Sequence, residues 1–365
     1  MTRAYSNRHQ TVRLLTAVFA IGALVACSGG DRREGDAAST RGGSVDLTGA
    51  GATFPYPIYS KWFSDYAATT GIRINYQSIG SGGGVRQLSE GTVDFGATDG
   101  PMSDKEIAGA KGGAVIHIPT VIGADAVIYN LPELKEPLKL SGDVVADIFL
   151  GKITKWNDPR IGALNAGVAL PTRDILIVHR SDGSGTTYVF TDYLSAVSPA
   201  WASGPGKGKD VRWPTGLGAK GNEGVAGQVK QTPGAIGYAE IAYARQNNLQ
   251  VAAIRNAAGE FVTPSIESIT EAASSVPLPP NTDYRISIVN SPRGYPISSF
   301  TWIILYQNQA DATKGRKIVD FLKWALTDGQ KSASTLDYAP LPQAMVAGIQ
   351  ERLASIKVGG AAGGT

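Results

Sequence analysis

The chain has 365 residues, of which 42% are hydrophobic and 45 are glycine, so one small core is excluded and an α/β protein of two lobes with many tight turns is favoured. The formal net charge of +3 arises from Arg3, Arg8 and Arg13. Removing these three from the 34 Lys and Arg leaves 31 basic against 31 acidic side chains, without the basic stripe of a nucleic-acid-binding protein.

The first 26 residues are predicted to be a targeting segment. The arginines precede an apolar run, residues 14–26, that is shorter than a membrane-spanning helix. The run ends Leu24-Val25-Ala26-Cys27, which resembles a lipobox, the processing signal of bacterial lipoproteins. The resemblance implies cleavage before Cys27, lipidation of this single cysteine and attachment to the cell membrane or the outer membrane. A plain signal peptide with an incidental cysteine is the alternative, and residues 27–45 are expected to form a flexible tether.

The mature region alternates short strands and helices. In chain order, we expect a helix with Ile58, Trp62, Phe63 and Tyr66 on its apolar face, a strand at 72–76, a helix beginning at 85–88, strands at 92–97, 115–118 and 126–129, a helix at 143–150, a strand at 175–178, a helix at 187–194, a strand at 235–238, a helix at 264–273, a strand at 300–306, and helices at 311–326 and 343–356. Residues 199–224 are expected to form a long irregular excursion.

This rhythm predicts an α/β fold with a parallel-rich sheet that helices cover on both faces. Lobe boundaries are expected near residues 120 and 285. In such sheets, ligands bind beyond the carboxyl ends of the strands.

Three turns at such ends are suited to anions: residues 49–54, 80–84 and 180–186. Glycines and small hydroxyl residues at a helix start offer backbone N–H groups, hydroxyls and the positive end of the helix dipole. Arg180 adds a guanidinium fork to the last turn. Together the turns predict a site for one tetrahedral oxyanion.

Seven segments in order resemble the substrate-binding proteins of bacterial phosphate ABC importers, the PstS family. They are residues 47–55, 76–85, 93–99, 150–153, 180–186, 213–216 and 233–238, and the resemblance extends over residues 46–355. It implies a type II periplasmic-binding-protein fold with a hinge and a central ligand cleft. Lobe one would comprise residues 46–120 plus 285–357, lobe two residues 121–284, and a disordered tail residues 358–365.

The resemblance also implies the site. Phosphate would be bound by Thr53, Phe54 through its backbone N–H, Ser81, Asp99, Arg180, Ser184, Gly185 and Thr186. Asp182 is expected to pair with Arg180 and to fix its fork. The implied role is high-affinity phosphate binding in the periplasm or at the cell surface, by a monomer without cofactor or catalysis. The implied partners are two permease subunits and two ATPase subunits.

Asp99 gives the sharpest hypothesis. A carboxylate beside a dianion is favourable only if the ligand donates a proton to it. Phosphate carries such a proton at neutral pH, and sulfate does not. Because a site that requires a hydrogen bond can reject analogues lacking it by ~10⁴–10⁵, Asp99 is predicted to select phosphate over sulfate.

Other classes of function fit the sequence less well. A binding protein for sulfate or molybdate is the main alternative, and Asp99 opposes it. A phosphatase or other hydrolase would have to use His179 and Ser184, but the spacing lacks the Gly-x-Ser-x-Gly elbow. The turn at 80–84 lacks the P-loop lysine, and there is no Cys/His cluster for zinc. A surface adhesion or sensor role remains a further alternative.

Overall fold

The computed structural model describes residues 46–279 and 282–359, which belong to one compact unit, Ser44–Thr365. The predicted signal segment, the tether, Cys27 and residues 360–365 lie outside the described residues. The predicted tail starts too early at 358, because Val358 lies in strand β14 (Lys357–Val358), which pairs with β13 (Asn308–Gln309). None of the helices in the described ranges is both long and apolar enough to cross a membrane.

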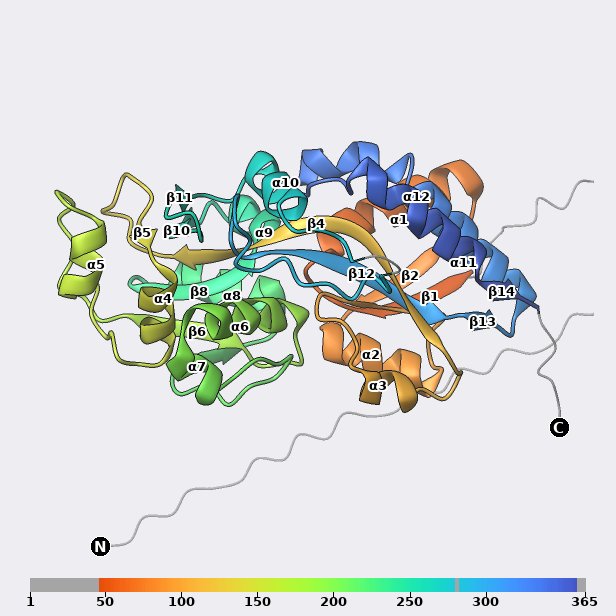
Figure 1. Ribbon diagram of the computed structural model, residues 1–365, viewed down its shortest axis with the longest axis horizontal. Coiled ribbons are helices and arrows are strands. Elements are labelled where there is room, and N and C mark those ends of the chain that lie inside the picture. The colour runs from red at the N-terminus through yellow and green to blue at the C-terminus, as the bar shows by residue number, and fades with distance from the viewer. Residues whose placement is uncertain (1–45, 280–281, 360–365) are drawn as a thin grey trace, which may run out of the picture. The chain divides into compact units, whose positions relative to one another are not determined.

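A nine-stranded mixed sheet organises these residues (Figure 1). Its order is β2-β1-β3-β12-β4-β8-β6-β7, with β9 paired to β4. The strands are β1 (Leu47–Gly51), β2 (Ile74–Ser78), β3 (Phe95–Thr98), β4 (Val115–Tyr129), β6 (Leu176–Arg180), β7 (Leu217–Ala219), β8 (Ala235–Glu240), β9 (Gln250–Val251) and β12 (Ser298–Tyr306). A smaller sheet holds β5 (Lys139–Leu140), β10 (Ala253–Arg255) and β11 (Phe261–Val262).

The parallel pairing predicted from the sequence occupies the two ends of the large sheet. At one end β1 runs parallel to β2 and β3, and at the other β6 runs parallel to β7 and β8. The centre differs from the prediction, because β12 and β4 pair antiparallel with each other and with their outer neighbours β3 and β8.

One long strand replaces two predicted short ones. Strand β4 is buried along its whole length; its first part pairs with β12, and residues 125–129 pair with β8. Pro119 lies between the two predicted strands and has no N–H to donate. The register shift between Thr301 and Trp302 lies opposite this proline, and such a bulge lets a strand continue through it.

Helices flank the sheet. They are α1 (Tyr56–Thr70), α2 (Ser81–Glu90), α3 (Asp104–Ala108), α4 (Gly142–Phe149), α5 (Pro159–Leu164), α6 (Gly185–Val197), α7 (Pro199–Ser203), α8 (Gly221–Gln231), α9 (Ile241–Gln246), α10 (Ile266–Ser274), α11 (Ala312–Ala325) and α12 (Gln343–Ala354), with a 3₁₀ helix, η1 (Gly329–Leu336). Figure 1 shows α1, α11 and α12 on one side of the β1–β3 end, and α2 and α3 on the other.

The predicted apolar face of α1 is confirmed. Ile58, Trp62, Phe63 and Tyr66 are all buried, as i, i+4 spacing on one helical face requires. Phe63 packs against Phe321 of α11 with 5.4 Å between ring centroids. The helix ends where Gly71 adopts a φ of 75°, a conformation that glycine reaches without strain.

The excursion predicted at residues 199–224 is partly ordered into regular structure. It contains α7, β7 and the first residues of α8. Helix α8 follows directly from β7, so its start faces the same region as the ends of the neighbouring strands.

Candidate anion-binding site

The predicted site residues lie at the carboxyl ends of strands. Thr53 and Phe54 follow β1, Ser81 begins α2 after β2, Asp99 follows β3, and Arg180 ends β6. Because β1 lies between β2 and β3 and runs parallel to both, the carboxyl ends of the three strands meet at one edge of the sheet. All five residues are buried, with at most 3% of their surface exposed.

The turn after β6 contacts the turn after β2. The N–H of Gly82 donates to the carbonyl of Gly183 over 2.8 Å. A Cβ on Gly185 would lie 2.5 Å from the hydroxyl oxygen of Ser81 and 2.6 Å from Oδ2 of Asp99. Only glycine permits this approach, so the two predicted anion-binding turns form one structure.

The start of α6 supplies several donors. Ser184 is its N-cap, and the Ser184 hydroxyl oxygen accepts from the N–H of Thr187 at 3.0 Å. The N–H groups of Gly185 and Thr186 lie in the first turn, where no carbonyl of the helix can accept them. Among the described residues, the N–H of Phe54 also has no acceptor. Such N–H groups and the positive helix end favour a bound anion.

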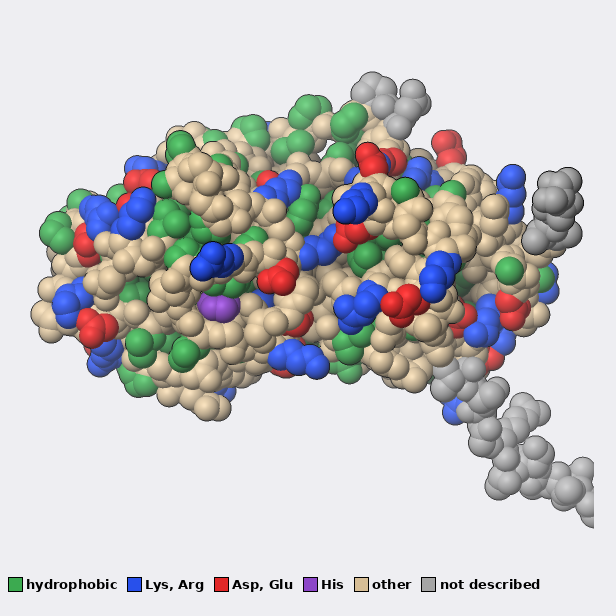
Figure 2. Space-filling view, turned by 90° about the horizontal axis from the view of Figure 1, so that it is seen from below, with side chains coloured by type: hydrophobic (Ala, Val, Ile, Leu, Met, Phe, Trp, Pro, Cys, Tyr) green, Lys and Arg blue, Asp and Glu red, His purple; other side chains and the backbone are tan. Residues whose placement is uncertain are grey.

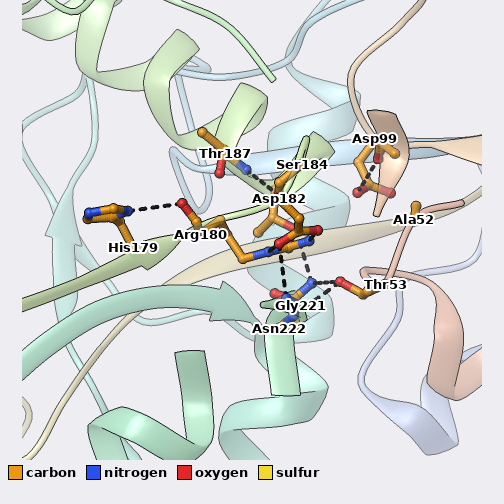
Figure 3. Close-up of polar contacts among 12 residues, drawn as sticks. Ala52, Thr53, Asp99, His179, Arg180, Asp182, Ser184, Thr187, Gly221 and Asn222 are labelled. Carbon is orange, nitrogen blue, oxygen red and sulfur yellow. Dashed lines mark hydrogen bonds and ion pairs between the residues drawn. The ribbon is translucent and has the colours of Figure 1, made fainter. Parts of the chain in front are cut away.

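Arg180 is fixed by the residue that the sequence predicts. Asp182 accepts from Nε of Arg180 at 2.8 Å and also from its Nη2 (Figure 3). Burial alone would raise the pKa of Asp182, but the hydrogen bonds and charge of Arg180 outweigh it and lower this pKa. Nη1 of Arg180 donates to the Thr186 hydroxyl oxygen at 3.2 Å. The fork is therefore charged and pre-oriented.

Asp99 is a carboxyl group among donors. Its Oδ1 accepts from the hydroxyl of Thr301 at 2.8 Å, and its Oδ2 lies 3.3 Å from the hydroxyl of Ser81. Burial raises the pKa of Asp99 to about 7, although Thr301, the charge of Arg180 and Ser81 oppose this shift. Asp99 lines a cavity of about 100 Å³, together with Lys207 and Arg285 among other residues.

Two residues at the site were not predicted from the sequence. Thr301 comes from the central strand β12, and Asn222 from the start of α8. Asn222 is fully buried, and its Nδ2 donates to the hydroxyl oxygens of Thr53 at 2.7 Å and of Thr186 at 3.0 Å. The sequence contains only a weak indication of Asn222. Gly221, which adopts a φ of 72°, precedes it as a turn residue within the segment predicted to be irregular.

The arrangement suits binding rather than hydrolysis. The Nδ1 of His179 lies 2.9 Å from the carbonyl oxygen of Arg180, and its ring stacks on Trp213 with 4.8 Å between centroids. Figure 3 shows this ring directed away from Ser184. Within residues 46–279 and 282–359, no group of three or more His, Cys, Asp or Glu side chains could hold a metal ion.

The face drawn in Figure 2 carries no field of one sign. Figure 2 shows basic and acidic side chains interspersed across one face of the molecule. This agrees with the equal numbers of basic and acidic residues after the first 26 residues. An anion would therefore be held by local hydrogen-bond donors and one guanidinium rather than by a global positive potential.

The fold and this buried cluster of donors define an α/β anion-binding protein of the periplasmic-binding-protein class. Residues 36–328 match the family described as the PBP superfamily domain. The phosphate-binding protein PstS of Pasteurella multocida (strain Pm70) is 47% identical over 307 residues, covering 83% of this chain and 88% of the relative. The namesake protein of Methanocaldococcus jannaschii is 40% identical over 332 residues, covering 84% and 85%. The chain belongs to the PstS family of phosphate-binding proteins.

Solved structures share the fold. A high-affinity periplasmic phosphate-binding protein bound with phosphate at pH 8.5 aligns with a TM-score of 0.67 and 22% identity, over 84% of this chain and 93% of that chain. A putative phosphate ABC transporter substrate-binding protein from Clostridium perfringens aligns with a TM-score of 0.60 and 16% identity, over 81% and 99%.

Proposed function

We propose that this protein binds inorganic phosphate outside the cytoplasm and delivers it to a phosphate ABC importer. The observation that carries the proposal is the buried carboxyl of Asp99 within a cluster of N–H and hydroxyl donors and the guanidinium of Arg180. The relatives at 40–47% identity that are named phosphate-binding proteins support it. As a member of this family, the protein is a binding protein and not an enzyme.

The ligand oxygens would be satisfied by groups that the fold already holds in place. We propose Thr53, Phe54, Ser81, Asp99, Arg180, Ser184, Gly185 and Thr186 as the phosphate contacts, with Asp182 orienting Arg180. A buried dianion needs a partner for each oxygen, because an unpaired polar group in a dry site is costly. The hydroxyls, N–H groups and guanidinium would donate to the phosphate oxygens that carry no hydrogen, and Asp99 would accept a hydrogen bond from the phosphate O–H.

Asp99 would supply the selectivity. Sulfate would place an oxygen lone pair against the ionised carboxylate without a compensating hydrogen bond. Since the pKa of Asp99 is about 7, a growing fraction of the carboxyl is protonated as the pH falls below neutral. A protonated Asp99 can donate to sulfate, so the discrimination between the two anions is expected to weaken in acid.

The binding movement would close two lobes, residues 46–120 plus 285–357 and residues 121–284. Strands β4 and β12 run through the centre of the shared sheet and are the candidates for the hinge. Across the proposed interface, Nζ of Lys209 lies 3.1 Å from Oε2 of Glu106, beside a groove of about 620 Å³. The carbonyl of Lys209 accepts from the N–H of Ser184 at 2.8 Å, so the ion pair is connected to a proposed phosphate contact.

Export and anchoring complete the proposal. The lipobox-like sequence before Cys27 supports a lipoprotein held at the cell membrane or the outer membrane, with the binding body in the periplasm or at the cell surface. Phosphate would pass to a pair of permease subunits driven by two ATPase subunits. Metabolic labelling with a radioactive fatty acid, compared between the wild type and Cys27→Ser, tests the anchor.

The binding proposal is tested by calorimetric titration with phosphate and with sulfate. Wild type is expected to bind phosphate and not sulfate, and Asp99→Asn to bind both anions more equally. Asp94→Asn is the matched control, because this carboxylate accepts from the Thr48 N–H at 2.7 Å and is not among the proposed contacts. Wild-type binding of sulfate would favour another oxyanion as ligand, and turnover of a phosphate ester would favour a phosphatase.

A further inference from the structure

Asn222 joins two of the proposed phosphate contacts. It follows β7 at the second position of α8 and is fully buried. Its Nδ2 donates to the hydroxyl oxygens of Thr53 and Thr186, as given above, and its backbone N–H donates to the Thr53 hydroxyl oxygen at 3.2 Å (Figure 3). Its Oδ1 accepts from the backbone N–H of Glu240 at 2.9 Å. Every polar group of the side chain is therefore used.

The bond from Glu240 fixes which way the amide points. A backbone N–H can only donate, so the side-chain atom facing it must be the carbonyl oxygen of Asn222. The NH₂ group is then directed at the two threonines, and an amide turned by 180° would place two donors against each other. The orientation follows from the hydrogen-bond network.

The amide in turn fixes the direction of both threonine hydroxyls. A hydroxyl oxygen has two lone pairs and one hydrogen. Both lone pairs of Thr53 accept from Asn222, from its backbone N–H and its Nδ2. Both lone pairs of Thr186 are also engaged, one by Nδ2 of Asn222 and one by Nη1 of Arg180. Each hydroxyl is left with only its hydrogen to offer.

We propose that Asn222 is a specificity-determining positioning residue that commits the hydroxyls of Thr53 and Thr186 to donate to the anion. The inference rests on the proposed phosphate site. It explains how a site lined with hydroxyls, which can donate or accept, presents donors at these two positions and leaves Asp99 to accept. A ligand with a hydrogen facing either threonine would meet two opposed donors.

The test is a double-mutant cycle with phosphate titrated by calorimetry. Asn222→Leu keeps a similar size but has no donor, so the hydroxyls of Thr53 and Thr186 lose their fixed direction. We expect phosphate affinity to fall about 10- to 100-fold, the value of two neutral hydrogen bonds. In a Thr53→Val/Thr186→Val background, the same substitution is expected to cause no further loss, because Asn222 has no hydroxyl left to orient.

A second variant and a control keep the test decisive. Asn222→Asp is nearly isosteric, but its carboxylate must accept from the hydroxyls, so phosphate binding should fall at least as far as in Asn222→Leu. Asn165→Leu is the control: Asn165 is buried, its Nδ2 donates to the Lys139 carbonyl at 2.8 Å, and it is not among the proposed contacts. It should lower the unfolding free energy and leave phosphate affinity unchanged.

The outcomes separate the two proposals. If wild type and Asn222→Asp bind phosphate equally well, the role of Asn222 is overturned and the proposed function stands. The same holds if Asn222→Leu lowers phosphate affinity by the same factor in the wild-type and the Thr53→Val/Thr186→Val backgrounds. If wild type binds no phosphate, the proposed function fails, and the role of Asn222 fails with it.

Discussion

Replacing Asp99 with Asn is expected to stabilise the phosphate-free protein at neutral and alkaline pH. Burial raises the pKa of this carboxyl from 3.8 to about 7. Between those two values the folded state binds the proton and the unfolded state has released it. The contribution of Asp99 to folding stability is therefore largest below pH 3.8 and falls as the pH rises to 7.

The size of the effect follows from the two pKa values. The difference between 3.8 and about 7 corresponds to about 4 kcal/mol of unfolding free energy over the whole window. Between pH 5 and pH 8 the same linkage gives about 2.5 kcal/mol. Asn cannot ionise, and its side-chain oxygen can still accept from Thr301, so this pH-dependent loss should be absent from the variant.

Urea unfolding in phosphate-free buffer at pH 5 and pH 8 measures the effect. Wild type should lose about 2.5 kcal/mol more than Asp99→Asn between these conditions. Asp174→Asn is the control, because the side chain of Asp174 is 71% exposed and pairs with Lys155 at the surface, so this variant should follow wild type. If wild type and Asp99→Asn lose stability in parallel, Asp99 is not held in a desolvated site and the reasoning fails.

Three further substitutions test other parts of the account. Arg180→Ala should weaken phosphate binding by about 2–4 kcal/mol in calorimetry, since a buried charged partner is lost; affinity within a factor of two of wild type would mean that the guanidinium does not contact the ligand. Lys209→Met removes the ion pair to Glu106 across the proposed interface, and should speed phosphate release in stopped-flow measurements by about threefold, as for a partly exposed pair; an unchanged rate would remove the ion pair from the closing movement. Asp125→Asn removes a carboxyl that is fully buried, with no partner for either oxygen in the described part of the chain and a pKa raised well above 3.8 by burial. Its urea-derived stability should decline less steeply above pH 3.8, by up to about 1.4 kcal/mol per pH unit, and an unaltered slope would contradict this.

The parts of the site that the sequence predicts are those set by local chain geometry. Each anion-binding turn directly follows its strand, so a strand–turn–helix pattern is enough to locate residues 80–84 and 180–186. The pairing of Asp182 with Arg180 is also local, because only one residue separates them. The lobe boundaries and the ligand contacts stay predictions, since the position of a bound anion is not contained in these patterns.

The parts that the sequence does not predict depend on contacts between distant residues. Asn222 lies 169 residues from Thr53, and Thr301 lies 202 residues from Asp99. Neither belongs to a motif: Asn222 follows a glycine in a segment of turn residues, and Thr301 is one residue of an apolar strand. Only the pairing of β12 with β3, and the direct start of α8 after β7, bring them to the site.

The continuity of β4 was missed for a related reason. Proline within a strand usually marks its end, and Pro119 separates two apolar runs. The shift in pairing beside this proline lies in β4 itself: Thr301 pairs with Val121 and Trp302 with Pro119, so Thr120 is an extra residue, and the sequence of one strand does not contain this register. The predicted division of the strand would have placed a loop where the sheet is in fact continuous.

The most direct measurement is a crystal structure of the mature protein grown with inorganic phosphate. We predict one phosphate with an oxygen within hydrogen-bonding distance of Oδ2 of Asp99, and with other oxygens contacting Arg180 and the hydroxyls of Thr53 and Thr186. A phosphate bound elsewhere, or a bound phosphate from which the carboxyl of Asp99 is turned away, would contradict it.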